Sequence, residues 1–218
     1  MMKLMQANKT LLYTSIIILF YTIGLVGIMI NPEFAVLSPL NLLLALVLLI
    51  LSIPEKNNFT YISLLFIFIS SYILENVGVN TGLLFGSYAY GEALGPKLMG
   101  TPLLIGVNWI IVSYTSVVFA NYIAEKLRIK LNQYSGAALA ALLMVMTDIP
   151  IELLCDRLNF WKWENNQIPL QNFTAWFFFG YIFCFWLIQN KLQSKNIFAI
   201  RLYLVQLFFF ILLNLFLA

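Results

Sequence analysis

The chain has 218 residues, of which 62% are hydrophobic and only 10% are charged, whereas a soluble domain has roughly 25% charged residues. This composition indicates an integral membrane protein. The net charge of +3 is small and the basic residues are scattered, which argues against a nucleic-acid partner. No histidine is present. The commonest metal ligand and the commonest general base are therefore missing, so we expect no metal site and chemistry by carboxylates, tyrosines and water.

Seven apolar stretches have the length that a membrane-spanning helix requires, roughly 17–25 residues. They are residues 11–30, 38–53, 59–79, 101–124, 134–154, 173–189 and 197–217. The fourth is expected to begin at Thr101, because threonine followed by proline suits a helix cap and first turn. No linker is long enough to separate two domains. We therefore predict an all-α, polytopic membrane protein of about seven transmembrane helices, with residues 1–218 forming a single integral membrane domain.

The basic residues set the expected orientation. If the N-terminus is cytoplasmic, nine of the twelve lysines and arginines fall on the cytoplasmic side, as the positive-inside rule requires. We expect a multi-pass protein of the cell (inner) membrane with its N-terminus cytoplasmic and its C-terminus outside. In that topology Glu75, near the end of the third helix, and Asp148, near the end of the fifth, lie at similar depth.

The connection between the third and fourth helices, residues 75–100, holds six of the eleven glycines. Gly78, Gly82 and Gly86 are four residues apart, a spacing that allows close helix packing. Their neighbours, however, are polar. Irregular polar backbone at membrane depth is tolerated where it is buried in protein or lines a cavity. We therefore predict a glycine-rich re-entrant or half-buried segment that walls a pocket.

Three acids interrupt the end of the fifth apolar stretch. Asp148, Glu152 and Asp156 are four residues apart, so a helix would place them on one face. Ionisable groups inside a span cost about 2.5–3.5 kcal/mol each and usually mark a functional site. Asp148 and Glu75 have no neighbouring base, and burial favours the protonated form that can serve as a general acid. For Glu152 and Asp156, an interfacial position with pairing to Arg157 and Lys162 is an equally good explanation.

Aromatic residues gather around both segments. They are Tyr88, Tyr90, Trp109, Trp161, Trp163 and Trp176. An interfacial aromatic belt is the simplest explanation for any one of them. Together with the acids they could also form a box of π faces, which attract a positive charge when water is excluded. An acid beside such a box suggests protonation of an apolar, electron-rich substrate and stabilisation of the resulting cation.

Several ordered blocks of the sequence carry a family resemblance. They are residues 75–90 (ENVGVNTGLLFGSYAY), Leu94-Gly-Pro, Gly100-Thr-Pro, Asp148-x-x-x-Glu152, Trp161-x-Trp163, Ile168-Pro and Asn172-Phe-x-x-Trp176. Together they resemble the membrane carotenoid-biosynthesis family, which includes the carotenoid 1,2-hydratases of the bacterioruberin, myxol and flexixanthin pathways. The resemblance extends over residues 70–180.

The resemblance implies an enzyme that adds water across the terminal C1=C2 double bond of an acyclic carotenoid end, such as that of lycopene or γ-carotene, without a cofactor. Protonation at C2 would create a tertiary carbocation at C1, which water would capture. Asp148 is the expected proton donor, Glu75 is the second candidate, and Glu152 would orient the water. The expected substrate-binding residues are Asn80, Tyr88, Tyr90, Trp109, Trp161, Trp163, Asn172 and Trp176.

Other functions stay open from the sequence. A membrane lycopene cyclase-like enzyme also protonates a carotenoid end, but an internal double bond captures the cation. A non-enzymatic seven-helix transporter would also have buried acids. A structural subunit that organises other carotenoid-pathway enzymes would explain the packing glycines but not the acids. The expected partners are a carotenoid substrate, the lipid bilayer and other carotenoid-pathway enzymes, and no nucleic acid is expected to bind.

Overall fold

The structure is a computed structural model that describes residues 2–54, 56–192 and 195–217. Within these residues it contains seven helices that are long and apolar enough to cross a membrane. They are α1 (Met2–Ile30), α2 (Ser38–Ser52), α3 (Asn58–Thr81), α4 (Leu104–Leu127), α5 (Gln133–Glu152), α6 (Leu170–Gln189) and α7 (Ile197–Leu217). This confirms the predicted all-α, polytopic membrane protein.

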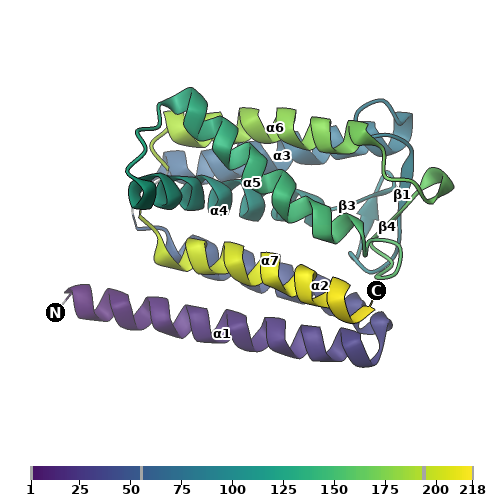
Figure 1. Ribbon diagram of the computed structural model, residues 1–218, viewed down its shortest axis with the longest axis horizontal. Coiled ribbons are helices and arrows are strands. Elements are labelled where there is room, and N and C mark those ends of the chain that lie inside the picture. The colour runs from purple at the N-terminus through teal and green to yellow at the C-terminus, as the bar shows by residue number, and fades with distance from the viewer. Residues whose placement is uncertain (1, 55, 193–194, 218) are drawn as a thin grey trace.

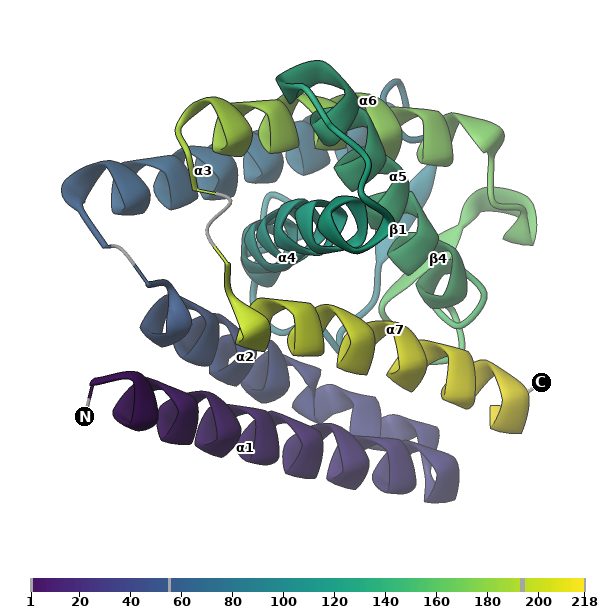
Figure 2. The ribbon, with the colours of Figure 1, turned by 60° about the vertical axis from the view of Figure 1, so that its left-hand side comes forward.

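Helix α4 forms the centre of the bundle. Of its most apolar stretch, 83% is buried inside the protein, against 22% for α1 and for the α2 region. Figure 2 shows α4 almost end-on, with α3, α5 and α6 on one side and α1, α2 and α7 on the other. Two buried hydroxyls of α4 are satisfied within the helix: Ser113 donates to the Trp109 carbonyl at 2.6 Å, and Thr115 donates to the Ile111 carbonyl at 2.7 Å. The buried Ser116 hydroxyl has no hydrogen-bond partner among the described residues. The central helix can therefore carry polar groups without exposing them to lipid.

The start of α4 differs from the prediction. Thr101 and Pro102 do not cap the helix; they form β3 (Thr101–Pro102), which pairs with β2 (Lys97–Leu98). The amide of Asn76 donates to the Met99 carbonyl at 3.1 Å and to the Thr101 hydroxyl at 3.3 Å. These contacts hold the segment as a short ribbon against α3, so the helix begins only at Leu104.

The glycine-rich connection is half-buried and contains no helix of its own. Gly82 ends α3 in the left-handed conformation, with φ of +68°, so the four-residue spacing of the glycines does not continue as a helical packing seam. Instead Gly78 and Gly86 each leave room for a ring. A Cβ at Gly78 would lie 2.5 Å from the Phe85 ring, and one at Gly86 would lie 2.5 Å from Pro169. The segment therefore packs tightly over the end of the bundle.

A second short ribbon joins the two long connections. Strand β1 (Tyr88–Tyr90) pairs antiparallel with β4 (Trp161–Trp163), placing Tyr88 opposite Trp163 and Tyr90 opposite Trp161. Figure 1 shows this ribbon at one end of the helices, the end where the chain also finishes. Because side chains alternate along a strand, the two tyrosines and two tryptophans share one face. The remaining short helices are η1 (Pro32–Leu37) and η2 (Glu164–Asn166).

Candidate functional site

Glu75, on α3, is surrounded by hydrogen-bond donors. Its side chain is 4% exposed. The hydroxyls of Tyr88 and Tyr90 donate to its Oε2 at 2.6 and 2.8 Å. The indole N–H of Trp109 donates to Oε1 at 2.8 Å. An ionised carboxylate only accepts hydrogen bonds, and three donors on one buried group are the surroundings that such an anion requires.

Glu152, the last residue of α5, has a matching set of donors. The indole N–H groups of Trp161 and Trp163 reach its Oε2 at 3.0 and 2.6 Å, and the amide of Asn172 reaches Oε1 at 2.7 Å. Glu152 is 4% exposed, so the interfacial explanation fails for this residue. It holds for Asp156, which lies beyond the end of α5 and pairs at 3.4 Å with Lys162 on the surface.

Asp148 is the least satisfied of the three buried acids. It is 1% exposed and receives one hydrogen bond, from the Asn172 amide to Oδ2 at 3.2 Å. Its Oδ1 is buried and has no hydrogen-bond partner among the described residues. The Asn172 amide thus bridges Asp148 and Glu152. Two of the acids are fully supplied with donors, whereas the third has a free oxygen.

The β1–β4 ribbon explains how the donors are aimed. The two tyrosines of β1 donate hydrogen bonds to Glu75, and the two tryptophans of β4 donate hydrogen bonds to Glu152. Burial, and then the negative charge of Glu75, raise the pKa of Tyr88 and Tyr90 well above the ordinary tyrosine value. Both hydroxyls therefore keep their hydrogen and remain donors at neutral pH.

A small cavity lies between the two glutamates, and we call it the polar cavity. Its volume is about 30 Å³, and a cavity needs roughly 10–15 Å³ to hold one water molecule. It has room for water but not for a hydrocarbon chain. It is lined by Glu75, Phe85, Tyr88, Tyr90, Ile105, Asn108, Trp109, Glu152, Trp161, Trp163, Asn172 and Trp176.

A neighbouring cavity of about 50 Å³, which we call the apolar cavity, is lined mainly by hydrocarbon side chains. Its lining residues are Ser38, Leu42, Leu94, Leu104, Ile105, Asn108, Asp148, Ile151, Phe160 and Trp161. Asp148 faces this cavity, while its bridge through Asn172 leads to the polar one. Glu75 and Glu152 line only the polar cavity. The three acids are thus divided between two adjacent spaces.

Asn108 is a site residue that is not among those predicted from the sequence. It lies on α4 and lines both cavities. Its side chain is half-buried and makes no hydrogen bond with any residue that the structure describes. The available signal was a polar amide next to Trp109 inside an apolar span, a position where polar residues are costly and usually functional.

Two other predicted binding residues have different surroundings. Asn80 lies outside both cavities, because its amide donates to the carbonyls of Asn76 at 2.8 Å and Met99 at 3.2 Å, which ties the β2–β3 turn to α3. Trp176 lines the polar cavity and stacks on Trp109, with ring centroids 4.3 Å apart. Asn80 therefore supports the loop, while Trp176 holds the Glu75 donor Trp109 in place.

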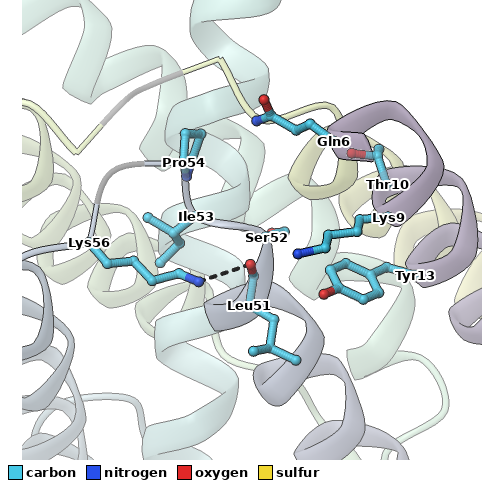
Figure 3. A pocket seen from close by; sticks show the side chains of 9 residues that line it. All are labelled: Gln6, Lys9, Thr10, Tyr13, Leu51, Ser52, Ile53, Pro54 and Lys56. Carbon is cyan, nitrogen blue, oxygen red and sulfur yellow. Dashed lines mark hydrogen bonds between the residues drawn. The ribbon is translucent and has the colours of Figure 1, made fainter. Parts of the chain in front are cut away.

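A much wider recess lies at the opposite end of the bundle. Its volume is about 380 Å³. Figure 3 shows its lining side chains, which come from the start of α1 and from the end of α2 and the residues that follow it. Lys9 and Lys56 line it, and the Lys56 ammonium donates to the Leu51 carbonyl at 3.0 Å. No carboxylate is among its described lining residues. The acids and the aromatic donors are therefore not found at this wider recess.

Comparison with known proteins identifies a matching family and a similar relative. The model of a family described as carotenoid biosynthesis protein matches residues 34–218, which include all three buried acids. The bisanhydrobacterioruberin hydratase of Haloarcula japonica is 27% identical over 157 residues, covering 69% of this chain and 51% of the relative. The chain thus spans about half the length of that relative. No solved structure matches the chain.

Proposed function

Because the chain belongs to the family of carotenoid biosynthesis proteins, we propose that it is a carotenoid 1,2-hydratase. It adds water across the terminal C1=C2 double bond of an acyclic carotenoid end, such as that of lycopene or γ-carotene. One observation carries this proposal: an acid with a free oxygen faces an apolar cavity, while two donor-supplied acids line an adjacent cavity with room for water. The similarity to a named hydratase supports it.

In the proposed first step Asp148 donates a proton to C2. The two glutamates have the surroundings of carboxylate anions, and a third negative charge beside them would be disfavoured. Asp148 has the fewest donors and is the group that holds a proton at least cost. The C1=C2 electron pair takes this proton at C2, leaving Asp148 as a carboxylate and C1 as a tertiary carbocation.

The second step joins water to the cation. The face of Trp161, which lines both cavities, and the charges of Glu75 and Glu152 stabilise the positive centre. A water in the polar cavity, oriented by Asn108 and Glu152, forms the C1–O bond. Glu152 accepts the proton that this water releases, and the proton returns to Asp148. Each turnover therefore consumes one water and leaves the protein unchanged.

Glu75 has a different role in this proposal from that of the proton donor. It lines the polar cavity only, and its three donors leave it no free oxygen directed toward the apolar side. Its negative charge acts at a distance on the cation, and it orders the tyrosines of the ribbon that closes the site.

The proposed orientation places this site near the outer face of the cell (inner) membrane, with a cytoplasmic N-terminus and an outer C-terminus. Support comes from the gathering of Lys9, Lys56 and Arg201 at the opposite end of the bundle, since positive residues are enriched on the cytoplasmic side. We treat residues 1–218 as a single membrane domain in this proposal.

Expression in lycopene-accumulating cells tests the function. The pigments are extracted and analysed by mass. A product heavier than lycopene by one water, formed by the parent and not by an Asp148→Asn variant, is the expected result. An isomer of unchanged mass with a new ring would indicate a cyclase. Unaltered lycopene would contradict both the hydratase and the cyclase.

A further inference from the structure

A third cavity, of about 140 Å³, lies between α1, α2 and α7. Three of its lining side chains are strongly exposed on the lipid-facing surface: Phe20 by 45%, Ile23 by 50% and Leu40 by 62%. The other wall is formed by Phe209 of α7. The cavity therefore reaches the surface that faces the hydrocarbon of the bilayer, and we call it the lateral cavity.

Only the start of α2 separates the lateral cavity from the apolar cavity at Asp148. Ser38 lines both. On the same helix Asn41 lines the lateral cavity, and Leu42 lines the apolar one. The Ser38 side chain is small, and its hydroxyl makes no hydrogen bond with the described residues. The N-terminus of α2 also has no side-chain cap.

Besides the Ser38 hydroxyl, the lateral cavity is lined by a second polar group without a described partner, the amide oxygen of Asn41. The Oδ1 of Asn41 is buried and has no hydrogen-bond partner in the described part of the chain. A buried polar atom without a partner is costly, and in an otherwise apolar cavity it favours a ligand that is mostly hydrocarbon but carries one hydroxyl hydrogen. The tertiary alcohol made by hydration has this composition, whereas the substrate end is pure hydrocarbon.

From these contacts we propose that the lateral cavity is the passage between the bilayer and Asp148. An acyclic isoprenoid chain enters past Ser38 with its double bond leading, and the alcohol leaves by the same route with its hydroxyl donating to Asn41. This inference rests on the proposed function, because it assigns the path of that substrate and product.

Filling the passage provides the test. A Cβ at Gly24 would lie 3.6 Å from the Phe209 ring and 4.0 Å from the Asn41 amide nitrogen, so the backbone admits a side chain that projects into the cavity. The variant is Gly24→Phe. The matched control is Val26→Phe on the same helix, where the side chain is 50% exposed to lipid.

Purified proteins in lipid nanodiscs are assayed on lycopene and on a short acyclic isoprenoid hydrocarbon with the same end group. Gly24→Phe is expected to lower kcat/KM for lycopene about tenfold or more, the effect of misplacing a single methylene group in an apolar pocket. The short substrate should lose less activity than lycopene, because it leaves the lateral cavity empty once its end is at Asp148. The Val26→Phe control should keep parental rates on both substrates. Equal rates for Gly24→Phe and Val26→Phe on lycopene would overturn the passage.

Two further results keep the test decisive. If Gly24→Phe loses activity equally on both substrates, Leu40→Trp at the lipid-facing mouth of the cavity is tested in its place. It should lower kcat/KM more for lycopene than for the short substrate, and rates on lycopene equal to those of Val26→Phe would overturn the passage. If the parent protein hydrates neither substrate, the proposed function itself fails, and not only the proposed passage.

Asn41→Leu should raise the Kd of the alcohol roughly two- to tenfold, the range of one net hydrogen bond, without raising that of lycopene. An equal change for both ligands contradicts the role of Asn41.

Discussion

The two ends of the bundle hold their polar groups in opposite ways. At the ribbon end, Glu75 and Glu152 are each held by three donors around a cavity of about 30 Å³. At the other end, Lys9 and Lys56 are exposed beside a recess of about 380 Å³. A buried, preorganised polar group acts far more strongly on a nearby charge than a solvated one does. Preorganisation, and not volume, therefore distinguishes the candidate site.

The largest expected effect is that of Asp148→Asn. An amide cannot supply the proton, so hydration should fall about 10²- to 10⁴-fold, the range for loss of a general acid. The rate of alcohol formation from lycopene in nanodiscs measures this loss. Asp156→Asn is the matched control, because Asp156 is exposed and paired only with Lys162. Comparable losses in both variants would remove the distinction between buried and surface acids.

Replacement of the free amide at the junction of the two cavities should come next. Asn108→Leu takes away a group that orients water, and a misplaced reactant costs about 100-fold. Alcohol formation should fall by that order while lycopene binding is retained. Asn121→Leu on the same helix is the control, since Asn121 lines neither cavity. Parental rates in Asn108→Leu would show that the water is positioned by other groups.

Replacing a tryptophan that donates a hydrogen bond should lower the free energy of unfolding more than replacing one that donates none. Trp163→Phe leaves Oε2 of Glu152 without its 2.6 Å donor, which should cost about 1–3 kcal/mol of unfolding free energy. Trp186→Phe is the comparison, because the Trp186 N–H is buried without a described partner, and its removal should be neutral or stabilising. Denaturation in detergent micelles measures both. Equal losses would mean that ring packing alone decides.

The alkaline limit of stability should depend on the ribbon tyrosines. Their pKa in the folded protein is raised above the value of about 10 in unfolded chains. Their contribution is therefore complete below pH 10 and is lost as the pH rises through the folded pKa. Melting temperatures from neutral to strongly alkaline pH should fall more steeply for the parent than for a Tyr88→Phe, Tyr90→Phe double variant. Parallel curves would contradict this assignment.

The smallest effect is expected at the basic end. Lys9→Gln and Lys56→Gln remove exposed charges, and such substitutions usually change stability by less than about 0.5 kcal/mol. Hydration rates should equal those of the parent. A loss of hydration similar to that of Asn108→Leu would mean that the wide recess takes part in the reaction.

The sequence alone determined the membrane fold and the presence of costly acids. Lipid requires long apolar helices with internally satisfied backbone groups, so spans are readable from composition, and the predicted stretch 197–217 coincides with α7. The placement of Glu75 and Asp148 toward the same end also followed from counting helices. Local information is sufficient for such features because each depends on one segment and its solvent.

The tertiary structure decided what each acid contacts. Strands β1 and β4 have three residues each, too few for a periodic pattern, and they pair across α4 and α5 in the sequence. That pairing determines which tyrosine or tryptophan reaches which glutamate. It also leaves Asp148 with a free oxygen and assigns Asn80 to a loop contact. Hydrogen-bond satisfaction is a property of groups brought together from distant segments, and single-segment patterns do not encode it.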